Sequence, residues 1–494
     1  MKYIGISAGF HDAAVSVVGD GKVLFAAHSE RYTRTKQDHL ITDAIIKEAL
    51  VYVDGDDYEI HYYERPWLKV LRQLYAGEKT SLSNLSPKKY LNDTALSLLN
   101  NKKFLTHSHH LSHAASSFQT SKFSEATVVI IDAIGEFDTV TIWNATYDSR
   151  GHAKYKKLYS KRYPNSIGLF YSALTERVGL KPNEEEYITM GMAAYGDNKH
   201  FTELKNNVID DVANLNFKVN LHTGFDEDFM PDATNVQLAH SGQLLLEQLV
   251  DSIMLRAKKI GNSNNLVFGG GVALNCLANR LLGKYFNNIW IMPNPGDAGS
   301  SLGAALLGYK KQVNFDSAFL GTNIQGSYPV NELINVLISD KIVGVASGRA
   351  EFGPRALGNR SLLADPRGKD IKDIVNGVKR RQKFRPFAPV ILEEHVHNYF
   401  MMPLNWRNSR YMQVIAKCKN PERFPAIAHA DGTSRVQTVP KNNSGIRLLL
   451  EEWYKKTGCP MLLNTSLNIR GEPMVNTLAD AAKFEATYGI RVLS

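Results

Sequence analysis

Strand-turn-strand patterns occur twice in this chain, at residues 3–31 and 126–146. A Gly-Asp-Gly turn at residues 19–21 marks the first hairpin. Two glycine-rich turns from strand to helix follow later, in LVFGGGVALN (266–275) and IMPNPGDAGSS (291–301). Hairpins combined with strand-to-helix turns are typical of α/β domains. The chain is therefore predicted to form two related α/β lobes around a nucleotide-binding cleft.

The length of the chain predicts more than one domain, because 494 residues exceed what a single hydrophobic core usually organises. The turn-rich segment GTNIQGSYP (321–329) is the expected boundary between a first domain at residues 1–320 and a second at residues 321–494. Apolar periodicity predicts helices at residues 41–53, 166–195 and 236–261. Residues 54–100 show no clear pattern.

Composition bears on the compartment. The first residues, MKYIGISAGF, are expected to form a buried strand rather than a signal peptide. No apolar run approaches the roughly 20 residues that span a bilayer, so no membrane partner is expected. Three cysteines without close spacing fit a reducing environment, and we expect a cytoplasmic protein. The sequence is compatible with an oligomer.

The net charge of +9 is unevenly distributed. Residues 341–494 hold 25 Lys and Arg against 13 Asp and Glu, which is a net +12, whereas the rest of the chain has a net −3. The positive charge therefore belongs to the last third of the chain. Small phosphate-bearing ligands explain it as well as a nucleic acid does.

A histidine pair is the main candidate for metal binding. His109 and His113, in THSHHLSHAASSF, would lie one turn apart on one side of a helix, where both imidazoles can grip one ion. Asp132 and Asp297 add two carboxylates, and this donor set suits Fe(II), Mn(II) or Zn(II). Two core histidines, a turn carboxylate at Asp132 and a helix N-cap at Asp297 are the structural alternatives.

Two further groups are expected to face the same cleft. Gly269, Gly270 and Gly271, with Asn275, allow the backbone to approach a phosphate at a helix N-terminus, although a tight turn explains them equally well. His11 and Asp12 could position an acceptor hydroxyl and take its proton. The alternative is that these two residues only close the turn.

The last third of the chain holds four motifs rich in Arg, Asn, Ser and Gly. They are GRAEFGPRALGNRSLLADPR (348–367), KRRQKFRPFAP (379–389), HADGTSRVQ (429–437) and LLNTSLNIRGEP (462–473). Arginines beside Gly, Asn and Ser are poor core material, and a buried arginine needs an anionic partner. The motifs favour a phosphate-binding pocket over a solvated basic face.

In this order the motifs resemble the O-carbamoyltransferases of the nodulation and tobramycin type, over nearly the whole chain. Besides the four motifs above, the resemblance rests on GFHD (9–12), SERYTRTKQD (29–38), HHLSH (109–113), GGGVALN and NPGDAGSSLGAA. It implies an actin/hexokinase-like α/β domain followed by an α+β domain similar to threonylcarbamoyl-adenylate synthases. The second domain would make carbamoyl-adenylate from carbamoyl phosphate and ATP with Mg²⁺. The first would transfer the carbamoyl group to an acceptor hydroxyl.

The resemblance also implies roles for individual residues. A divalent metal, usually iron, would be held by His109, His113, Asp132 and Asp297. The adenylate would lie near the glycine turn 269–271, Asn275 and Gly296. Carbamoyl phosphate and ATP would meet a longer set of residues, namely Arg355, Lys379, Arg385, His429, Thr433, Arg435, Ser466 and Asn468.

The chain departs from the family pattern at several positions, and the acceptor stays open. Ile188 stands where relatives usually have Lys in the E-x-K-x-M-G stretch, Ala133 replaces a usual Gly, and a last family segment is expected to be missing after Ser494. A sugar-like polyol and a hydroxymethylpyrimidine, free or in nucleic acid, are the two acceptor classes. The basic run 154–162 mildly favours nucleic acid, and the net charge of the first domain mildly opposes it. A tRNA threonylcarbamoyl-type transferase is the alternative function, and a non-catalytic actin-like scaffold is a third.

Overall fold

The computed structural model describes residues 1–494, which form two compact units. The first unit comprises Met1–Leu24 and His39–Phe315, and the second comprises Phe25–Asp38 and Asp316–Ser494. The functional division at residue 320 stays a prediction. No helix of the structure combines the length and apolar character that a bilayer span requires.

The first sheet of unit one has the strand order β3-β2-β1-β4-β5. Its strands are β1 (Lys2–Ser7), β2 (Ala14–Gly19), β3 (Lys22–His28), β4 (Tyr58–Tyr62) and β5 (Phe104–Thr106). β2 is antiparallel to β1, while β4 and β5 run parallel to it. At the predicted Gly-Asp-Gly turn, both Asp20 and Gly21 have positive φ, as a tight hairpin requires.

The second sheet repeats this order as β8-β7-β6-β11-β12. It is formed by β6 (Glu125–Gly135), β7 (Asp138–Tyr147), β8 (Ala153–Arg162), β11 (Asn265–Gly269) and β12 (Asn288–Ile291). The first three strands form an antiparallel meander, and β11 and β12 run parallel to β6. Two five-stranded sheets of one order confirm the predicted actin/hexokinase-like α/β fold with two related lobes.

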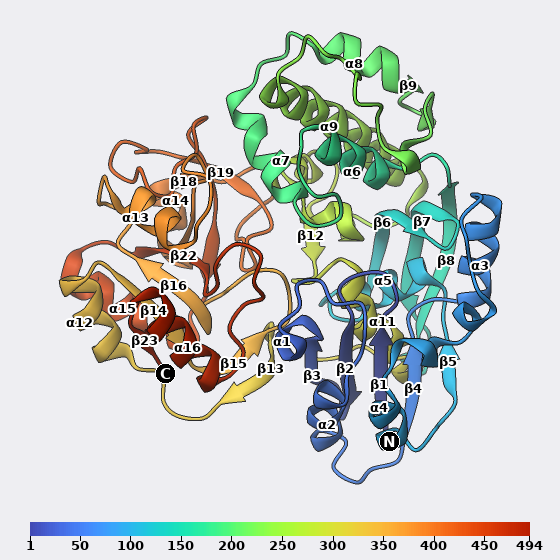
Figure 1. Cartoon of the computed structure of the whole chain (residues 1–494), viewed down its shortest axis with the longest axis horizontal. Coiled ribbons are helices and arrows are strands. Elements are labelled where there is room, and N and C mark those ends of the chain that lie inside the picture. Colours follow the sequence, from blue (N-terminus) through green and yellow to red (C-terminus); the bar gives the residue numbers. More distant parts are fainter. The chain divides into compact units, whose positions relative to one another are not determined.

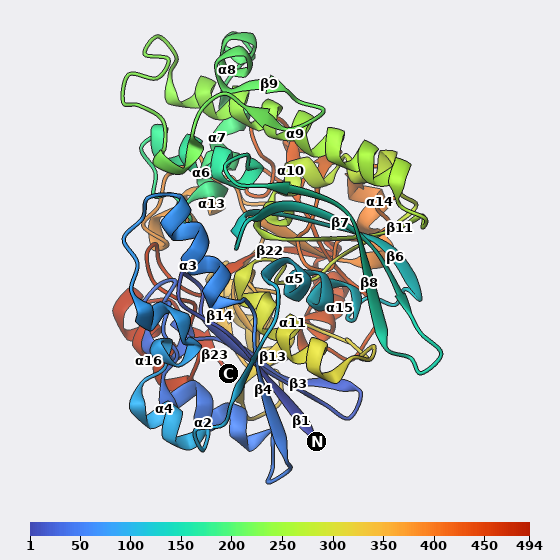
Figure 2. The same ribbon diagram turned by 90° about the vertical axis from the view of Figure 1, so that its right-hand side faces the viewer.

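Two helices lie between the sheets. α5 (His109–Phe118) packs on β6 and β11, α11 (Asp297–Tyr309) packs on β1, β2 and β4, and the two helices pack on each other (Figure 2). Glycines allow this close approach, since a Cβ on Gly303 would lie 1.8 Å from the carbonyl oxygen of Ser112. The core is therefore layered as sheet, α11, α5 and sheet.

The remaining helices of unit one surround this core (Figure 1). They are α2 (Asp43–Val51), α3 (Pro66–Tyr75), α4 (Asp93–Leu98), α6 (Ile167–Arg177), α7 (Glu186–Met192), α8 (Phe201–Val208), α9 (Asn235–Ile260) and α10 (Cys276–Asn279), with a small hairpin of β9 (Ile209–Asp211) and β10 (Asn216–Phe217). The helix predicted at residues 236–261 is confirmed, and a capping box of Thr234 and Gln237 starts it. The helical pattern predicted at residues 166–195 corresponds to two helices, α6 and α7, and the chain breaks between them around Gly179, which has φ +79°.

Unit two is built on a six-stranded sheet of order β21-β17-β22-β16-β14-β23. These strands are β14 (Ile342–Ala346), β16 (Arg360–Ala364), β17 (Ala388–Leu392), β21 (Gln437–Val439), β22 (Met461–Ser466) and β23 (Val492–Leu493). Smaller sheets join β13 (Phe319–Ile324) to β15 (Gly348–Glu351), and β18 (Phe400–Met401) to β19 (Ile415–Cys418) and β20 (Thr433–Arg435). The sheet is mixed and mostly antiparallel, which confirms the α+β class predicted for this part.

Helices cover both faces of this sheet. α12 (Val330–Ser339) and α15 (Gly445–Thr457) share one apolar cluster with Leu363 and Leu462. α13 (Ile371–Val378) and α16 (Leu478–Tyr488) share another with the neighbouring strand residues Leu362 and Leu463. Adjacent residues thus point to opposite faces, as a strand requires. The short helices α1 (Glu30–Thr33) and α14 (Val396–Tyr399) complete the unit.

Candidate active site and metal centre

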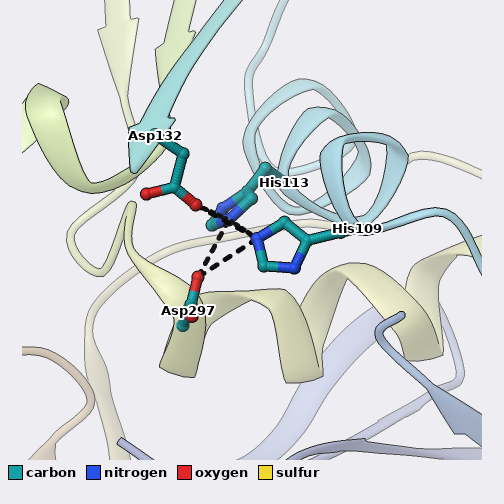
Figure 3. A group of neighbouring side chains, drawn as sticks. All are labelled: His109, His113, Asp132 and Asp297. Carbon is teal, nitrogen blue, oxygen red and sulfur yellow. Dashed lines mark hydrogen bonds and ion pairs between the residues drawn. The ribbon is translucent and has the colours of Figure 1, made fainter. Parts of the chain in front are cut away.

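Four side chains of unit one converge on one point (Figure 3). The Nε2 atoms of His109 and His113 lie 3.0 Å apart, and both lie 3.1–3.2 Å from Oδ2 of Asp132. Oδ1 of Asp297 is 3.3 Å from the first imidazole and 3.2 Å from the second. One donor atom from each residue fits within 4.8 Å of all the others. The structure therefore brings together all four metal ligands that the sequence suggested.

The fold positions each of the four. His109 and His113 occupy the first two turns of α5 on one helix face. Asp132 lies where the pairing of β6 with β7 shifts register, after Ile131, and such bulges redirect side chains. Asp297 is the first residue of α11. All four are at least nine-tenths buried.

Neither aspartate is used by the alternative that the sequence left open. The N-cap of α11 is Gly296, and no side-chain cap bond is present, so Asp297 does not cap that helix. Oδ1 of Asp132 accepts a hydrogen bond from the backbone N–H of Gly271 at 3.2 Å, which leaves Oδ2 for the imidazoles. Both carboxylates are thus turned toward the histidine pair.

The donor set fits a divalent cation. Nδ1 of His113 lies 3.1 Å from the carbonyl oxygen of Pro295, so this nitrogen carries the proton and Nε2 presents its lone pair. Burial lowers the pKa of His109, but the charge of Asp297 and hydrogen bonds to both aspartates raise it well above its ordinary value. The negative charges of the two aspartates therefore favour a positive charge at this point. A metal ion supplies that charge while the histidines that bind it stay neutral.

His11 lies beside this cluster. Its Nε2 is 4.0 Å from Oδ2 of Asp297, and its Nδ1 is 3.2 Å from Oδ2 of Asp12. A quarter of the His11 side chain is exposed, so an incoming molecule can reach it. Burial lowers its pKa, but the hydrogen bond to Asp12 and the aspartate charges raise it to about 9. The structure thus places the pair beside the cluster, and its role toward an acceptor hydroxyl stays a prediction.

The glycine-rich turn after β11 supports Asp132 rather than starting a long helix. Gly270 has φ +86°, and a Cβ there would lie 2.2 Å from the carbonyl oxygen of Ile131. The chain continues as a 3-10 turn at Gly271–Leu274 and then as the four-residue α10, and the approach of an adenylate phosphate to this turn stays a prediction. Asn275 caps α10 and exchanges hydrogen bonds with Gln243 at 2.9 and 3.1 Å.

In unit two, Lys379 forms hydrogen bonds with two of the other residues predicted to bind carbamoyl phosphate. Its Nζ donates to the backbone oxygens of Ser466 (2.6 Å) and Asn468 (2.9 Å) and lies 2.9–3.1 Å from their side-chain oxygens. Burial lowers the pKa of Lys379 well below its ordinary value, and the nearby charges of Arg381 and Arg385 lower it further. The amine is thus held in a dry, basic environment.

The other predicted phosphate ligands lie on separate elements of unit two. Thr433 and Arg435 lie on β20, and Thr433 donates to Asp431 at 2.7 Å. His429 accepts a backbone hydrogen bond from Ala430 through Nδ1. Arg355 follows β15, and Arg385 precedes β17.

Sequence analysis missed a carboxylate behind the histidine pair. Glu64 lies between β4 and α3 and places Oε2 3.8 Å from Nδ1 of His109. The next residue, Arg65, donates to both oxygens of Glu136 in the β6–β7 turn. Glu64 and Arg65 follow shortly after β4, and their two charges are the local signal that could have marked a site. They lie in residues 54–100, however, where the sequence shows no clear pattern.

Comparison with known proteins defines the family. A model of the carbamoyltransferase N-terminus matches residues 2–306, and a model of the carbamoyltransferase C-terminus matches residues 334–494. The chain belongs to the carbamoyltransferase family. It is accordingly a transferase, as the resemblance implied.

Relatives of this carbamoyltransferase family member include proteins that it matches almost end to end. An uncharacterised protein of Synechocystis sp. is 33% identical, with 97% of this chain and 93% of that protein covered. Nodulation protein NolNO of Sinorhizobium fredii is 30% identical, with 95% and 76% covered. Among solved structures, HypF of T. kodakarensis has a TM-score of 0.37 at 13% identity, covering 62% of this chain and 47% of HypF.

Proposed function

We propose that this protein is an O-carbamoyltransferase that makes carbamoyl-adenylate from carbamoyl phosphate and ATP and then passes the carbamoyl group to an acceptor hydroxyl. The observation that carries the proposal is the buried cluster of two imidazoles and two carboxylates with His11 4.0 Å from Asp297. A carbamoyl mixed anhydride needs its phosphate neutralised and a base beside its carbonyl. A cation held by the four side chains would neutralise the phosphate, and His11 is the candidate base beside them.

Unit two is the proposed site of adenylate formation. There carbamoyl phosphate would lose inorganic phosphate to water, and an oxygen of the resulting carbamate would bond to the α-phosphate of ATP and displace pyrophosphate. Lys379, Ser466 and Asn468 present an amine, a hydroxyl and an amide within hydrogen-bond distance of one another. These groups can hold the phosphate of carbamoyl phosphate once it displaces the backbone oxygens around the amine. The net charge of +12 over residues 341–494 favours binding of two polyanionic substrates in this part of the chain.

Unit one is the proposed site of carbamoyl transfer. A divalent cation such as Fe(II), Mn(II) or Zn(II), held by His109, His113, Asp132 and Asp297, would polarise the carbamoyl carbonyl and neutralise the adenylate phosphate. The acceptor oxygen forms a bond to the carbonyl carbon, the bond from that carbon to the phosphate oxygen breaks, and AMP leaves with its electron pair. A cation held by Asp132 and Asp297 would offset their share of the negative charge that raises the pKa of His11. His11, oriented by Asp12, would then take the acceptor proton at Nε2.

The acceptor surface is marked by an exposed aromatic ring. Phe10 has 58% of its surface exposed, and its ring centroid is 4.7 Å from that of His11. A flat apolar ring beside the base suits the face of a sugar or of a hydroxymethylpyrimidine.

The basic run of residues 154–162 gives the nucleic-acid acceptor little support. It forms β8, the edge strand of the second sheet. Lys157 and Arg162 pair with Asp138, and Lys154 pairs with Asp148. Paired charges release fewer counterions from a polyanion than free ones do. A small acceptor is therefore the stronger of the two candidates.

The test is incubation of the protein with ATP, labelled carbamoyl phosphate and a panel of hydroxyl acceptors. We expect label on one acceptor, with pyrophosphate released from ATP only when carbamoyl phosphate is present. His113→Ala should lower the rate of transfer by at least about 100-fold, because loss of a metal ligand costs more activity than loss of a residue that only orients a ligand. His152→Ala, between β7 and β8, is the matched control. No transfer to any acceptor and no carbamoyl phosphate-dependent pyrophosphate would refute the proposal.

The same incubation separates the threonylcarbamoyl-type alternative. A transferase of that type requires threonine as a co-substrate, so its activity would appear only when threonine is added. We expect the labelled product to form at the same rate with and without threonine.

A further inference from the structure

We propose that Glu64, held in place by Lys69, is a positioning residue that orients His109 for metal binding and makes the charge of the centre suit a divalent ion. This inference rests on the metal centre of the proposed function. Glu64 is not one of the four residues that converge on the proposed metal position. It acts through the imidazole ring in front of it.

The two histidines of the cluster are supported differently. Nδ1 of His113 is satisfied by the carbonyl oxygen of Pro295 at 3.1 Å. Nδ1 of His109 is buried and has no hydrogen-bond partner within reach. Oε2 of Glu64 lies 3.8 Å from this nitrogen. A buried imidazole N–H is costly to leave unpaired, so this carboxylate is its natural acceptor.

Surrounding contacts fix both partners near that geometry. Oε1 of Glu64 accepts from Nζ of Lys69 at 2.8 Å, which leaves Oε2 for the imidazole. The ring of His109 lies against Tyr63, with centroids 5.2 Å apart, and against Gly135, where a Cβ would come within 2.6 Å of the ring. Closing the remaining gap to an ordinary charge-assisted hydrogen bond takes a movement of about 1 Å.

The burial of Glu64 and Lys69 is not explained by the stability that an ion pair provides. Glu64 is 3% exposed and the Lys69 side chain 13% exposed. Buried ion pairs contribute little net stability compared with apolar replacements of the same size. A carboxylate behind a ligating imidazole, in contrast, fixes its tautomer and strengthens it as a ligand.

The charges of the cluster also favour a divalent ion. Asp132, Asp297 and Glu64 supply three negative charges, and Lys69 returns one positive charge. A cation of charge +2 makes the whole group neutral, whereas a trivalent ion leaves it positive in a buried environment. Neutral buried groups avoid the desolvation cost of isolated charge.

The experiment is Co²⁺ titration of the full-length protein, followed by equilibrium dialysis and by the visible absorption of bound Co²⁺. Wild type, Glu64→Gln and the double variant Glu64→Gln with Lys69→Met are compared, since the double variant leaves no unpaired lysine if the single one folds poorly. Glu59→Gln, on β4 beside His61, is the control, because this glutamate also faces an imidazole but lies outside the cluster. We expect the dissociation constant for Co²⁺ to rise roughly 10–100-fold in both Glu64 variants and to stay unchanged in the control.

A merely structural Glu64 would lower the metal-free melting temperature and leave Co²⁺ affinity unchanged. That result, or identical Co²⁺ affinity and absorption in all variants, overturns the inference. A wild-type protein that binds no Co²⁺, or that binds it equally well with His113→Ala, overturns the metal centre itself. The two failures are therefore distinguishable.

Discussion

At the scale of single residues, Lys379 is a charged group that unit two keeps almost entirely away from water. Its amine is buried and surrounded by oxygen atoms of Ser466 and Asn468. Burial and two neighbouring arginines lower its pKa well below the ordinary value. The amine therefore gives up its proton at a lower pH than an exposed lysine does.

This environment predicts the pH dependence of carbamoyl phosphate binding. Only the protonated amine attracts a phosphate, so affinity should be full at low pH and fall as pH rises through the lowered pKa of Lys379. The fall should amount to roughly tenfold per pH unit above that pKa, because one bound proton is required. Calorimetric titration from pH 6.5 to 9.5 measures it. Affinity that stays constant across that range would contradict the assignment.

Single residues also show what the sequence could and could not predict. The spacing of His109 and His113 placed both on one helix face, because helical geometry is local. The role of Asp297 could not be decided in that way, since an N-cap and a ligand have the same position at the start of a helix. Glu64 was missed because its contact with His109 depends on β4 and α5, which meet only in the folded unit.

At the scale of elements, the crossing of α5 and α11 holds the two sheets and the histidine pair in register. The helices approach so closely at Gly303 that even a methyl group would strike the backbone of Ser112. Small residues at such crossings let helix backbones come into contact. The position of α11, and so of Asp297, depends on this spacing.

Gly303→Ala should therefore lower the free energy of unfolding by about 2–3 kcal/mol, because overpacking forces the two backbones apart. Gly377→Ala in α13 is the control, since nothing lies within 4 Å of a Cβ there. That substitution should stabilise the protein by about 0.5–1 kcal/mol through helix propensity. Urea denaturation followed by circular dichroism compares the two. Equal effects at both positions would be inconsistent with the close crossing.

Elements with strong local signals were predicted well, and interrupted ones were not. α9 has a capping box and a continuous apolar face, so its range could be given within one residue. α6 and α7 both lie within the stretch predicted as helical, but the break between them at Gly179 was not predicted. The stretch 54–100 forms short elements, of which α3 is the longest with 10 residues, so it holds no long periodic pattern.

At the scale of the whole molecule, the units are not two uninterrupted stretches of chain. Residues Phe25–Asp38 count with the second unit. Within that unit, Arg34 donates to the carbonyl oxygens of Met474 at 2.7 Å and Pro473 at 2.9 Å. This guanidinium thus ties α1 to the segment that leads into α16.

Arg34→Met should loosen that segment. Each bond from a charged donor is worth about 1.5–3 kcal/mol when buried, and the partial exposure of this side chain reduces the total to about 1–2 kcal/mol. Hydrogen exchange of residues 472–488 should accelerate by roughly tenfold, as measured by mass spectrometry. Exchange elsewhere in unit two serves as the internal reference, and an unchanged rate in 472–488 would exclude this role.

Ligand linkage offers a second prediction at this scale. A divalent cation at 100 times its dissociation constant should stabilise the transition in which unit one unfolds by about 2.7 kcal/mol, because only the folded cluster binds it. Differential scanning calorimetry with Mn²⁺ and with EDTA tests this. In His113→Ala the two scans should coincide, and a cation effect of equal size in that variant would argue against binding at the cluster.

The two repeats of unit one each supply a different part of the site. α5 follows the fifth strand of the first repeat, and α11 follows the fifth strand of the second, so the two helices are counterparts. One contributes His109 and His113, and the other contributes Asp297. His11 follows the first strand of one repeat, and Asp132 lies near the end of the corresponding strand in the other. Neither half possesses a complete set of ligands, so a fragment that contained one repeat alone would offer a cation either two imidazoles or two carboxylates, never all four groups.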